Sequence, residues 1–388
     1  MEWIRKRKFS RTIIAALLLT MTAWLLPAGL MAEKAEAATT LKNPRIVEES
    51  SMDAGQKVTW DSVWFGSYPQ SEVVCETDIE RISELTGGAY DSQYVTVSSA
   101  QWDKITGAKY NNYGDAAVGG VKYKRLSKTD ANYAISGSSE YYKWGDDTVR
   151  YFRYEPIKWR VLNVNGTDAF LLADKALDDQ RYNTSYTSIT WEKCTMRSWL
   201  NGYDSSVNTY GTDYSGKNFI NTAFTSSERR AIKTTEVVND NNISYSTAGG
   251  NDTSDKVFLL SENEVYNSNT AFSYGFVKGR GTYDEGRRCK SSTFAKAMGV
   301  FSSIDSSYAG NCWWWLRSPG QDTAYAAFVS NGGDVAYPHG SYVDHDSIAV
   351  RPALHLDLSS SDLYSYAGTV SSSEVSSNQI DGTVSVPY

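Results

Sequence analysis

Residues 311–320 read N-C-W-W-W-L-R-S-P-G, and the three adjacent tryptophans decide how the fold is interpreted. Side chains alternate along a β-strand, so Trp313 and Trp315 would face one way and Trp314 the other. A platform for stacking sugars needs one exposed aromatic face, whereas large apolar residues on both faces indicate a strand covered on both sides. The sequence therefore predicts that these indoles lie in the core.

Two arginines occupy similar places beside core strands. Arg317 follows the tryptophans, and Arg351 lies in V-R-P-A-L. A planar guanidinium group can tie loops together through carboxylates and backbone carbonyls. We expect both side chains to brace the structure rather than to act in catalysis.

Strand patterns open and close the core. Residues 63–70 favour a strand that ends at Pro69, because proline cannot donate to a ladder. Residues 156–162 and 169–173 favour a hairpin around Asn165-Gly166, a pair typical of type I′ turns. Further strands are expected at 256–260, 312–316, 325–330, 333–337 and 348–358.

Helices are expected in the middle of the chain. Residues 191–200 place apolar side chains on one stripe, and residues 294–298 form a short helix closed by Gly299. Thr225 with Glu228 and Ser261 with Glu264 have the spacing of capping boxes. Few parallel βαβ alternations occur, so we predict an α+β fold with a small antiparallel or mixed sheet, short helices and long loops.

The N-terminal residues 1–37 have the pattern of a secretory signal peptide. Basic residues precede an apolar run over 13–31, and Ala35-Glu36-Ala37 offers a cleavage site. A retained membrane anchor is the alternative, but Pro27 and Gly29 interrupt the apolar run. We therefore expect a secreted or cell-surface protein with no integral membrane segment after cleavage.

The charge balance is acidic. The formal net charge of the whole chain is -7, and cleavage after residue 37 would make it more negative. An acidic protein is a poor partner for nucleic acid or anionic lipid. The chain has four cysteines, an even number. They could form up to two disulfides, with three possible connectivities, or remain buried free thiols.

Composition divides the rest of the chain into three parts. Residues 38–56 are polar and predicted to be a spacer, and residues 57–358 are predicted to be a single domain, with an insertion at 87–150. Residues 359–388 are rich in serine and lack lysine and arginine, which is typical of a flexible tail.

Five motifs occur in order and carry a family resemblance. Together they are similar to a widespread bacterial family of exported domains of unknown function, which resembles the C-type-lectin-like fold. That fold is shared by the formylglycine-generating enzyme group and by variable proteins diversified by retroelements. The resemblance extends from residue 65 to residue 358. The motifs are W-E-K-C-T-M-R-S-W-L-N, F-I-N-T-A-F-T-S-S-E, V-F-L-L-S-E-N-E-V, W-W-L-R-S-P-G and V-R-P-A-L-H-L.

The resemblance implies a face of irregular loops that binds a partner. In the diversified relatives the displayed positions lie between the W-L-R-S-P strand and the final R-P strand. Tyrosine and small polar residues suit such a surface, because tyrosine gives rigid amphipathic area and polar residues adapt their hydrogen bonds. Carried over by position, the ligand-binding residues are Tyr325, Asn331, Tyr337, His339, Tyr342, Asp344, His345 and Asp346.

The search for catalytic or metal chemistry gives weak signals. His339, His345 and His355 lie close in sequence beside two aspartates, but loop polarity explains this grouping without a metal. Runs such as N-D-N-N and G-N-D-T-S-D contain ligands that calcium prefers, without EF-hand spacing. We expect no cofactor, with calcium as an alternative. Asp178-Asp179 and Glu155 are the most prominent acids, and we expect them to be solvated.

The sequence leaves three functions open. The first is an exported binding module that presents its loops to a glycan or protein at the cell surface. The second is an exported enzyme related to formylglycine-generating oxidases, although Cys312 does not match the cysteine pattern of that group. The third is a structural protein of the cell envelope. We expect a binding module rather than an enzyme, and no catalytic residues are predicted.

Overall fold

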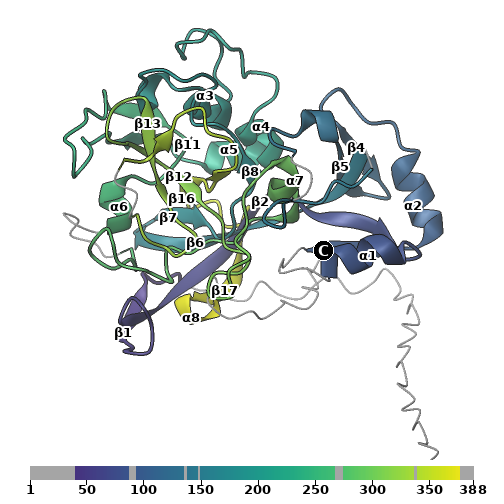
Figure 1. Cartoon of the computed structure of the whole chain (residues 1–388), viewed down its shortest axis with the longest axis horizontal. Helices are drawn as coiled ribbons and strands as arrows, with labels where there is room; N and C mark the ends of the chain where they lie inside the picture. Colours follow the sequence, from purple (N-terminus) through teal and green to yellow (C-terminus); the bar gives the residue numbers. More distant parts are fainter. Residues whose placement is uncertain are drawn as a thin grey trace, which may run out of the picture. The chain divides into compact units, whose positions relative to one another are not determined.

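Two long antiparallel strands, β2 (Gln56–Cys75) and β6 (Val149–Asn165), run through the largest sheet of the computed structural model (Figure 1). The structure describes residues 40–86, 93–134, 138–146, 149–266, 274–335 and 339–375. Within these residues the sheet has ten strands, in the order β1-β2-β6-β7-β16-β11. In addition, β17 and β3 pair with β2, β5 pairs with β6, and β4 pairs with β5. The other strands are β1 (Arg45–Glu48), β3 (Tyr94–Val97), β4 (Asp115–Val118), β5 (Val121–Ser127), β7 (Asp168–Ala173), β11 (Val257–Phe258), β16 (Ala353–Asp357) and β17 (Ser365–Ser371).

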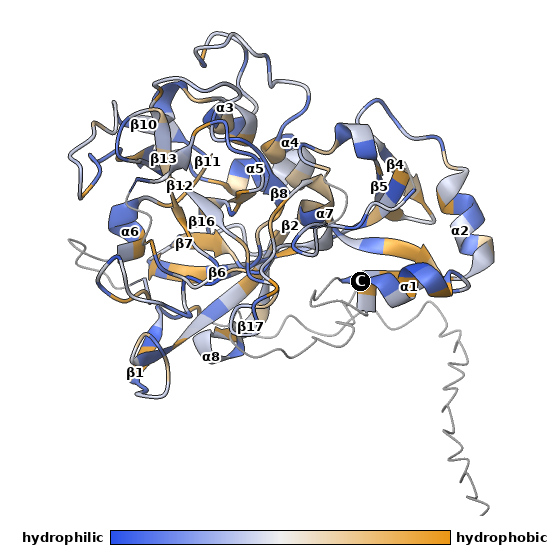
Figure 2. Ribbon diagram, in the orientation of Figure 1, coloured by the Kyte–Doolittle hydropathy of each residue, from blue (hydrophilic) through white to orange (hydrophobic). Residues whose placement is uncertain are grey.

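Tryptophans anchor both long strands to their surroundings. Trp60 in β2 and Trp159 in β6 are fully buried. Each indole N–H donates to a backbone carbonyl, that of Tyr274 at 2.9 Å and that of Phe65 at 2.8 Å respectively. A buried indole usually needs such a partner, because its N–H is costly to leave unpaired. Figure 2 shows that β7 is largely hydrophobic, as expected for a strand that faces the core.

The strand predicted at 63–70 does not end at Pro69. It is the middle of the 20-residue β2, which pairs with Tyr154 of β6 at Pro69 and has an irregular register just beyond it. The opposite edge of β2 is occupied by β17 up to Trp64 and by β3 from Glu72. Pro69 therefore lies where β2 has one neighbouring strand, and its missing N–H interrupts no second ladder.

The predicted hairpin is confirmed, with its turn shifted by one residue. Asn165 pairs with Asp168, so the turn consists of Gly166 and Thr167. Gly166 has a φ of +59°, which glycine adopts at little cost.

The tryptophan strand belongs to a second sheet of five described strands, in the order β14-β13-β12-β15-β8. Trp314 and Trp315 in β12 are completely buried, which confirms that both faces of this strand are covered. Trp313 precedes the strand and is partly buried, stacked on Phe301 with ring centroids 4.3 Å apart. The strands are β8 (Asp178–Asp179), β12 (Trp314–Pro319), β13 (Tyr325–Val329), β14 (Ser341–Tyr342) and β15 (Ala349–Val350).

The predicted helices form short elements around the sheets. The segment 191–200 divides at Cys194 into a 3-10 turn, η2 (Trp191–Lys193), and α3 (Thr195–Asn201). Both capping boxes are present, at α5 and at α6. Gly299 closes α7, as predicted. The other bounds here are α4 (Phe219–Ala223), α5 (Ser226–Ala231), α6 (Glu262–Tyr266), α7 (Thr293–Met298) and a two-stranded sheet of β9 (Thr235–Val237) and β10 (Thr253–Asp255).

The segment predicted as an insertion extends the main sheet. It contributes β3, β4 and β5, and its helix α2 (Ser99–Thr106) packs through Ile105 into a small separate apolar cluster with Val73 and Tyr123. The fold is α+β, as predicted, but the main sheet is not small. Its size follows from the length of β2 and β6, which pair with several shorter strands that are distant in sequence.

The flanking segments are more ordered than their composition suggested. Residues 45–48, in the predicted spacer, form β1 and pair with β2. Residues 365–371, in the predicted flexible tail, form β17 and also pair with β2, followed by α8 (Ser372–Val375). Backbone pairing at the edges of β2 outweighs the flexibility expected of serine-rich sequence. A further helix, α1 (Ile79–Thr86), follows β2.

The predicted signal peptide, residues 1–37, lies outside the described residues. In the part of the chain that is described, no helix is long and apolar enough to cross a membrane.

Candidate functional site

Three tyrosine rings gather on the surface where β13 and β14 meet, and we call them the tyrosine cluster: Tyr186, Tyr325 and Tyr342. Tyr325 and Tyr342 are directly opposite each other in the β13–β14 register, with ring centroids 4.7 Å apart. Tyr186 packs edge-on against Tyr342 at 5.2 Å. Tyr186 is 56% exposed and Tyr342 47% exposed, so the cluster presents aromatic surface to solvent.

Backbone hydrogen bonds fix the loop that carries Tyr186. The N–H of Asn183 donates to the carbonyl of Val343 at 2.7 Å, and the N–H of Ile189 donates to that of Thr323 at 2.8 Å. Both ends of the loop 183–189 are therefore tied to the segments around β13 and β14. The cluster is held by the fold on both sides, which lowers the entropic cost of ordering it around a ligand.

The tyrosine hydroxyls also interact within the cluster. A hydrogen bond between Tyr325 and Tyr342 raises the pKa of Tyr325 to about 12, with burial adding in the same direction. The Tyr325 phenol is therefore neutral near neutral pH. The hydroxyls of the cluster can donate or accept hydrogen bonds beside its rings.

An ion pair joins the loop after β8 to the loop after β14. The guanidinium of Arg181 contacts both carboxylate oxygens of Asp346, at 2.7 and 2.9 Å, and also donates to the carbonyl of Thr184 at 3.3 Å. Bidentate geometry of this kind fixes orientation as well as contributing energy. Tyr186 lies in the first of these loops, and Tyr342 ends β14 directly before the second.

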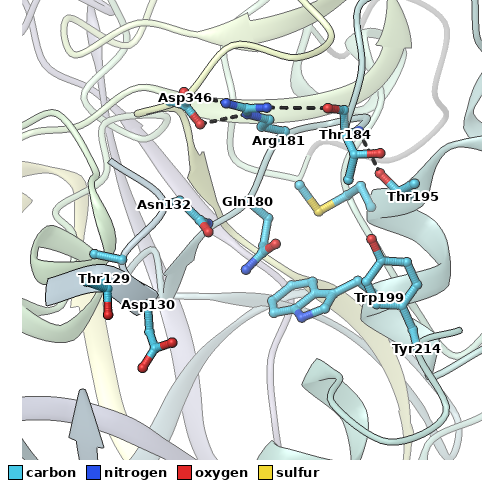
Figure 3. A pocket seen from close by; sticks show the side chains of 12 residues that line it. Thr129, Asp130, Asn132, Gln180, Arg181, Thr184, Thr195, Trp199, Tyr214 and Asp346 are labelled. Carbon is cyan, nitrogen blue, oxygen red and sulfur yellow. Dashed lines mark hydrogen bonds and ion pairs between the residues drawn. The ribbon is translucent and has the colours of Figure 1, made fainter. Parts of the chain in front are cut away.

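A polar cavity of about 350 Å³ lies beside this ion pair. Figure 3 shows the Arg181–Asp346 pair on one side of the cavity and the Trp199 indole on the other, with the Gln180 amide between them in this view. Asn132 also points a side-chain amide into this region. The lining residues are Thr129, Asp130, Ala131, Asn132, Gln180, Arg181, Thr184, Thr195, Met196, Trp199, Tyr214 and Asp346.

Five separate segments build the cavity. The 3-10 turn η1 (Lys128–Asp130) and the residues after it form one wall. The side chain of Asn132 donates to the carbonyl of Asp179, which attaches this wall to β8. Trp199 comes from α3 and is 6% exposed, so only a small part of its ring reaches the cavity. Aromatic surface with convergent amide and charged groups is typical of small-molecule sites.

Asp178 and Asp179, which we expected to be solvated, are buried in β8. The Asp178 carboxylate accepts a hydrogen bond from the Tyr68 hydroxyl and another from the N–H of Asp179 at 2.8 Å. Burial raises the pKa of Asp178 to about 6 despite the hydrogen bond from Tyr68, which lowers it. Burial and the charge of Asp178 raise the pKa of Asp179 as well. This burial could not be predicted from the sequence, because β8 is formed by long-range pairing with β15.

The predicted binding residues divide into groups. The structure brings Tyr325 and Tyr342 together and places Asp346 at the cavity. His339 lies near Tyr245, whose hydroxyl is 3.2 Å from its Nδ1. Asp344 is half-buried in the loop after β14, and in the same loop the Nδ1 of His345 contacts the carbonyl of Asp346.

Asn331 is partly buried and lies beside the tryptophan segment. Its side-chain oxygen accepts from the indole of Trp313 at 3.3 Å, and its carbonyl accepts from Asn311 at 3.1 Å, so it supports the tryptophan segment. Tyr337 lies outside the described residues.

The three histidines have separate partners. His355 is in β16, where it contacts Asp168 at 2.8 Å and stacks on Phe170. Among the described residues there is no group of three or more histidine, cysteine or acidic side chains arranged to hold a metal ion. In the two acidic runs considered for calcium, Asp255 pairs with Arg197 at 2.8 Å and Asp252 accepts from the N–H of Asn239.

Both arginines predicted as braces have that role in the structure. Arg317 contacts Glu264 and the carbonyls of Val238 and Leu259. Arg351 is fully buried, donates to the carbonyls of Ala173, Arg287 and Asp174, and lies over the ring of Trp314 at 4.9 Å.

Sequence reasoning missed Tyr186, Arg181 and Trp199. Tyr186 lies in R-Y-N-T-S-Y-T-S, a polar tyrosine-containing loop of the same character as the segment around Tyr342, and that composition could have identified it. Arg181 and Trp199 offered no such signal, because their role depends on which distant segments they meet.

Comparison with known proteins gives one match. Residues 166–358 match the model of a domain of unknown function (DUF6273). This agrees with the predicted resemblance to a domain family of unknown function. No curated protein and no solved structure gives a significant match. The matched range contains the tyrosine cluster, Arg181 and Trp199, whereas the cavity wall at 129–132 lies before it.

Proposed function

We propose that this chain is an exported glycan-binding module whose ligand contacts the tyrosine cluster and extends toward the polar cavity. The observation that carries the proposal is that neighbouring residues of the same two segments contribute to the tyrosine cluster and to the cavity. Tyr186 follows Thr184 of the cavity rim by two residues in sequence, and Tyr342 precedes Asp346 by four. A ligand that stacks on the rings can therefore place polar groups toward the ion pair.

The chemistry of this surface suits a sugar. Exposed tyrosine rings offer flat apolar area against which the C–H face of a pyranose can pack, and their hydroxyls offer hydrogen bonds at the edge. Asn132, Gln180 and the Arg181–Asp346 pair supply donors and acceptors that match sugar hydroxyls. A protein partner is the alternative, but the concave polar cavity favours a small polar group over a flat protein surface.

The sequence resemblance supports the proposal. The motifs that resemble C-type-lectin-like proteins imply a fold that presents loops to a partner, and we propose that fold for residues 57–358. We also propose that residues 1–37 direct export and are removed, so that the protein acts outside the cell or on its surface. N-terminal sequencing of secreted protein tests the last point, with Ala38 expected as the first residue.

Glycan-array binding of the secreted protein tests the function. Single-site sugar recognition is often weak, so we expect a Kd in the millimolar range, about 4 kcal/mol. Replacing Tyr186 and Tyr342 together with alanine should weaken binding at least about tenfold, equivalent to about 1.4 kcal/mol.

The matched control is Tyr366→Ala, because Tyr366 is a 43% exposed tyrosine in β17. This variant should bind like the unchanged protein. Absence of any glycan ligand, or equal loss of binding in the control, would contradict the proposal. Binding of a surface protein that depends on Tyr186 and Tyr342 would favour the alternative.

A further inference from the structure

Two of the four cysteines are neighbours across a short antiparallel contact. Lys290 and Asn311 form an antiparallel bridge, which places Cys289 directly opposite Cys312. The N–H of Cys312 donates to the carbonyl of Cys289 at 2.8 Å, and the Cys312 thiol lies 3.3 Å from the same carbonyl. Residues opposite each other in such a pair have Cα atoms about 5.5 Å apart and side chains on the same face, within the range that a disulfide spans.

The other two cysteines have different surroundings. Cys75 ends β2 and its thiol contacts the hydroxyls of Thr77 and Ser99. Cys194 caps α3, and its thiol contacts the carbonyl of Trp191. All four are buried with free thiols in the structure, and each of these two is satisfied locally. Geometry therefore selects one of the pairings that the sequence left open.

The charges around the pair favour reaction at Cys289. Burial acts to raise its pKa, but a hydrogen bond with the Cys312 thiol and the charges of Arg351 and Arg160 outweigh burial and lower the pKa to about 7. Burial and the same contact raise the pKa of Cys312. A thiolate is the nucleophile in thiol–disulfide exchange, so Cys289 is the better attacking group of the two.

We propose that Cys289 and Cys312 form a structural disulfide when the chain folds under oxidising conditions. The oxidant is a low-molecular-weight or protein disulfide. The Cys289 thiolate attacks one sulfur of that disulfide and expels the other as a thiolate, giving a mixed disulfide. Cys312 then loses its proton and attacks Cys289, which releases the second thiolate. The cysteines lose two electrons and two protons, and the oxidant becomes two thiols.

Bond formation is compatible with the buried charges nearby. Arg351 keeps its three carbonyl contacts and its position over the Trp314 ring when the Cys289 thiolate is consumed. The bridge would close the segment 289–312, which contains α7 and Phe301. Because Phe301 stacks on Trp313, the bond would fix this segment against the tryptophan strand. This inference is independent of glycan binding.

Thiol mapping of the full chain tests the proposal. The protein is refolded in a mixture of oxidised and reduced glutathione, unfolded in urea with an alkylating reagent, and digested for mass spectrometry. We expect two alkylated cysteines, Cys75 and Cys194, and one bridged peptide pair containing Cys289 and Cys312. Four alkylated thiols, or a bridge to Cys75 or Cys194, would overturn it.

Two variants keep the test decisive even if one of them does not fold. The double variant Cys75→Ser with Cys194→Ser should keep the bridge, and a reductant should lower its urea midpoint. In Cys312→Ser the reductant should leave the midpoint unchanged. If Cys312→Ser does not fold, the double variant still decides, because a midpoint that is insensitive to reductant in that variant contradicts the proposal.

Discussion

The tryptophan strand and the tyrosine cluster are two aromatic regions of this chain with opposite environments. Trp314 and Trp315 are completely buried, and their indole N–H groups each donate to a backbone carbonyl at 3.1 Å. Tyr186 and Tyr342 are about half exposed, and the Tyr342 ring packs against both Tyr186 and Tyr325. The tryptophans thus act as core residues, whereas the tyrosines form surface.

This difference shows that aromatic content alone does not locate a binding surface. Three adjacent indoles attract attention in the sequence, yet alternation along the strand places them on two covered faces. The tyrosines are dispersed in the sequence and meet only because β13 pairs with β14 and the loop 183–189 lies against them. The comparison therefore predicts that the two regions respond differently to substitution.

The largest expected effect is on the stability of the tryptophan strand. Trp314→Ala should lower the free energy of unfolding by about 3–5 kcal/mol, because it leaves a large cavity and removes the ring beneath Arg351. Tyr342→Ala should change it by about 0.5 kcal/mol or less. Urea unfolding of both variants measures the difference, and similar losses would remove the distinction between the two regions.

The second prediction concerns the pH dependence of stability. It rests on Asp178 in β8, a buried strand that pairs with β15 in the sheet of the tryptophan strand. Since the folded pKa of Asp178 is about 6, above that of the unfolded chain, the folded state holds a proton between about pH 4 and 6 that the unfolded state has released. The free energy of unfolding should therefore fall as pH rises through this window, by up to about 3 kcal/mol.

Asp178→Asn tests this prediction because it removes the titrating carboxyl group while keeping an acceptor for Tyr68. Its stability relative to the unchanged protein should improve between about pH 4 and pH 7, as measured by urea unfolding. A constant difference across this range would show that the carboxyl is ionised in the folded protein throughout.

The smallest expected effect on stability is at the ion pair between the two loops. The Arg181 side chain is 42% exposed, and such pairs contribute about 0–1 kcal/mol. Arg181→Met should therefore unfold almost like the unchanged protein but bind its glycan more weakly. A variant that loses stability and keeps its affinity would place this pair with the structural braces instead.

Local features of the fold could be predicted from the sequence. The hairpin at Gly166, the capping box of Thr225 with Glu228 and the end of α7 at Gly299 depend on residues a few positions apart. Features that depend on distant partners were not predicted. The continuation of β2 past Pro69 and the pairing of β17 require knowing which strands flank β2.

The same distinction between local features and long-range contacts applies to the candidate site. Tyr325 and Tyr342 were predicted from the family resemblance, which implies displayed positions between the W-L-R-S-P strand and the final R-P strand. The cavity could not be predicted, because its lining residues come from segments that are distant in sequence. These segments are residues 129–132, the loop after β8, α3, Tyr214 and the loop after β14. The contact between the Asn331 side chain and the Trp313 indole was not predicted either, because it depends on how distant segments fold together.

Hydroxyl-radical footprinting with residue-level mass spectrometry, with and without the strongest glycan from the array, tests the central contrast most directly. Our account predicts strong labelling of Tyr186 and Tyr342 in the folded protein, protection of both by the glycan, and almost no labelling of Trp314 and Trp315 in either sample. Labelling of Trp314 and Trp315 comparable to that of the tyrosines, or bound glycan that leaves Tyr186 and Tyr342 unprotected, would contradict it.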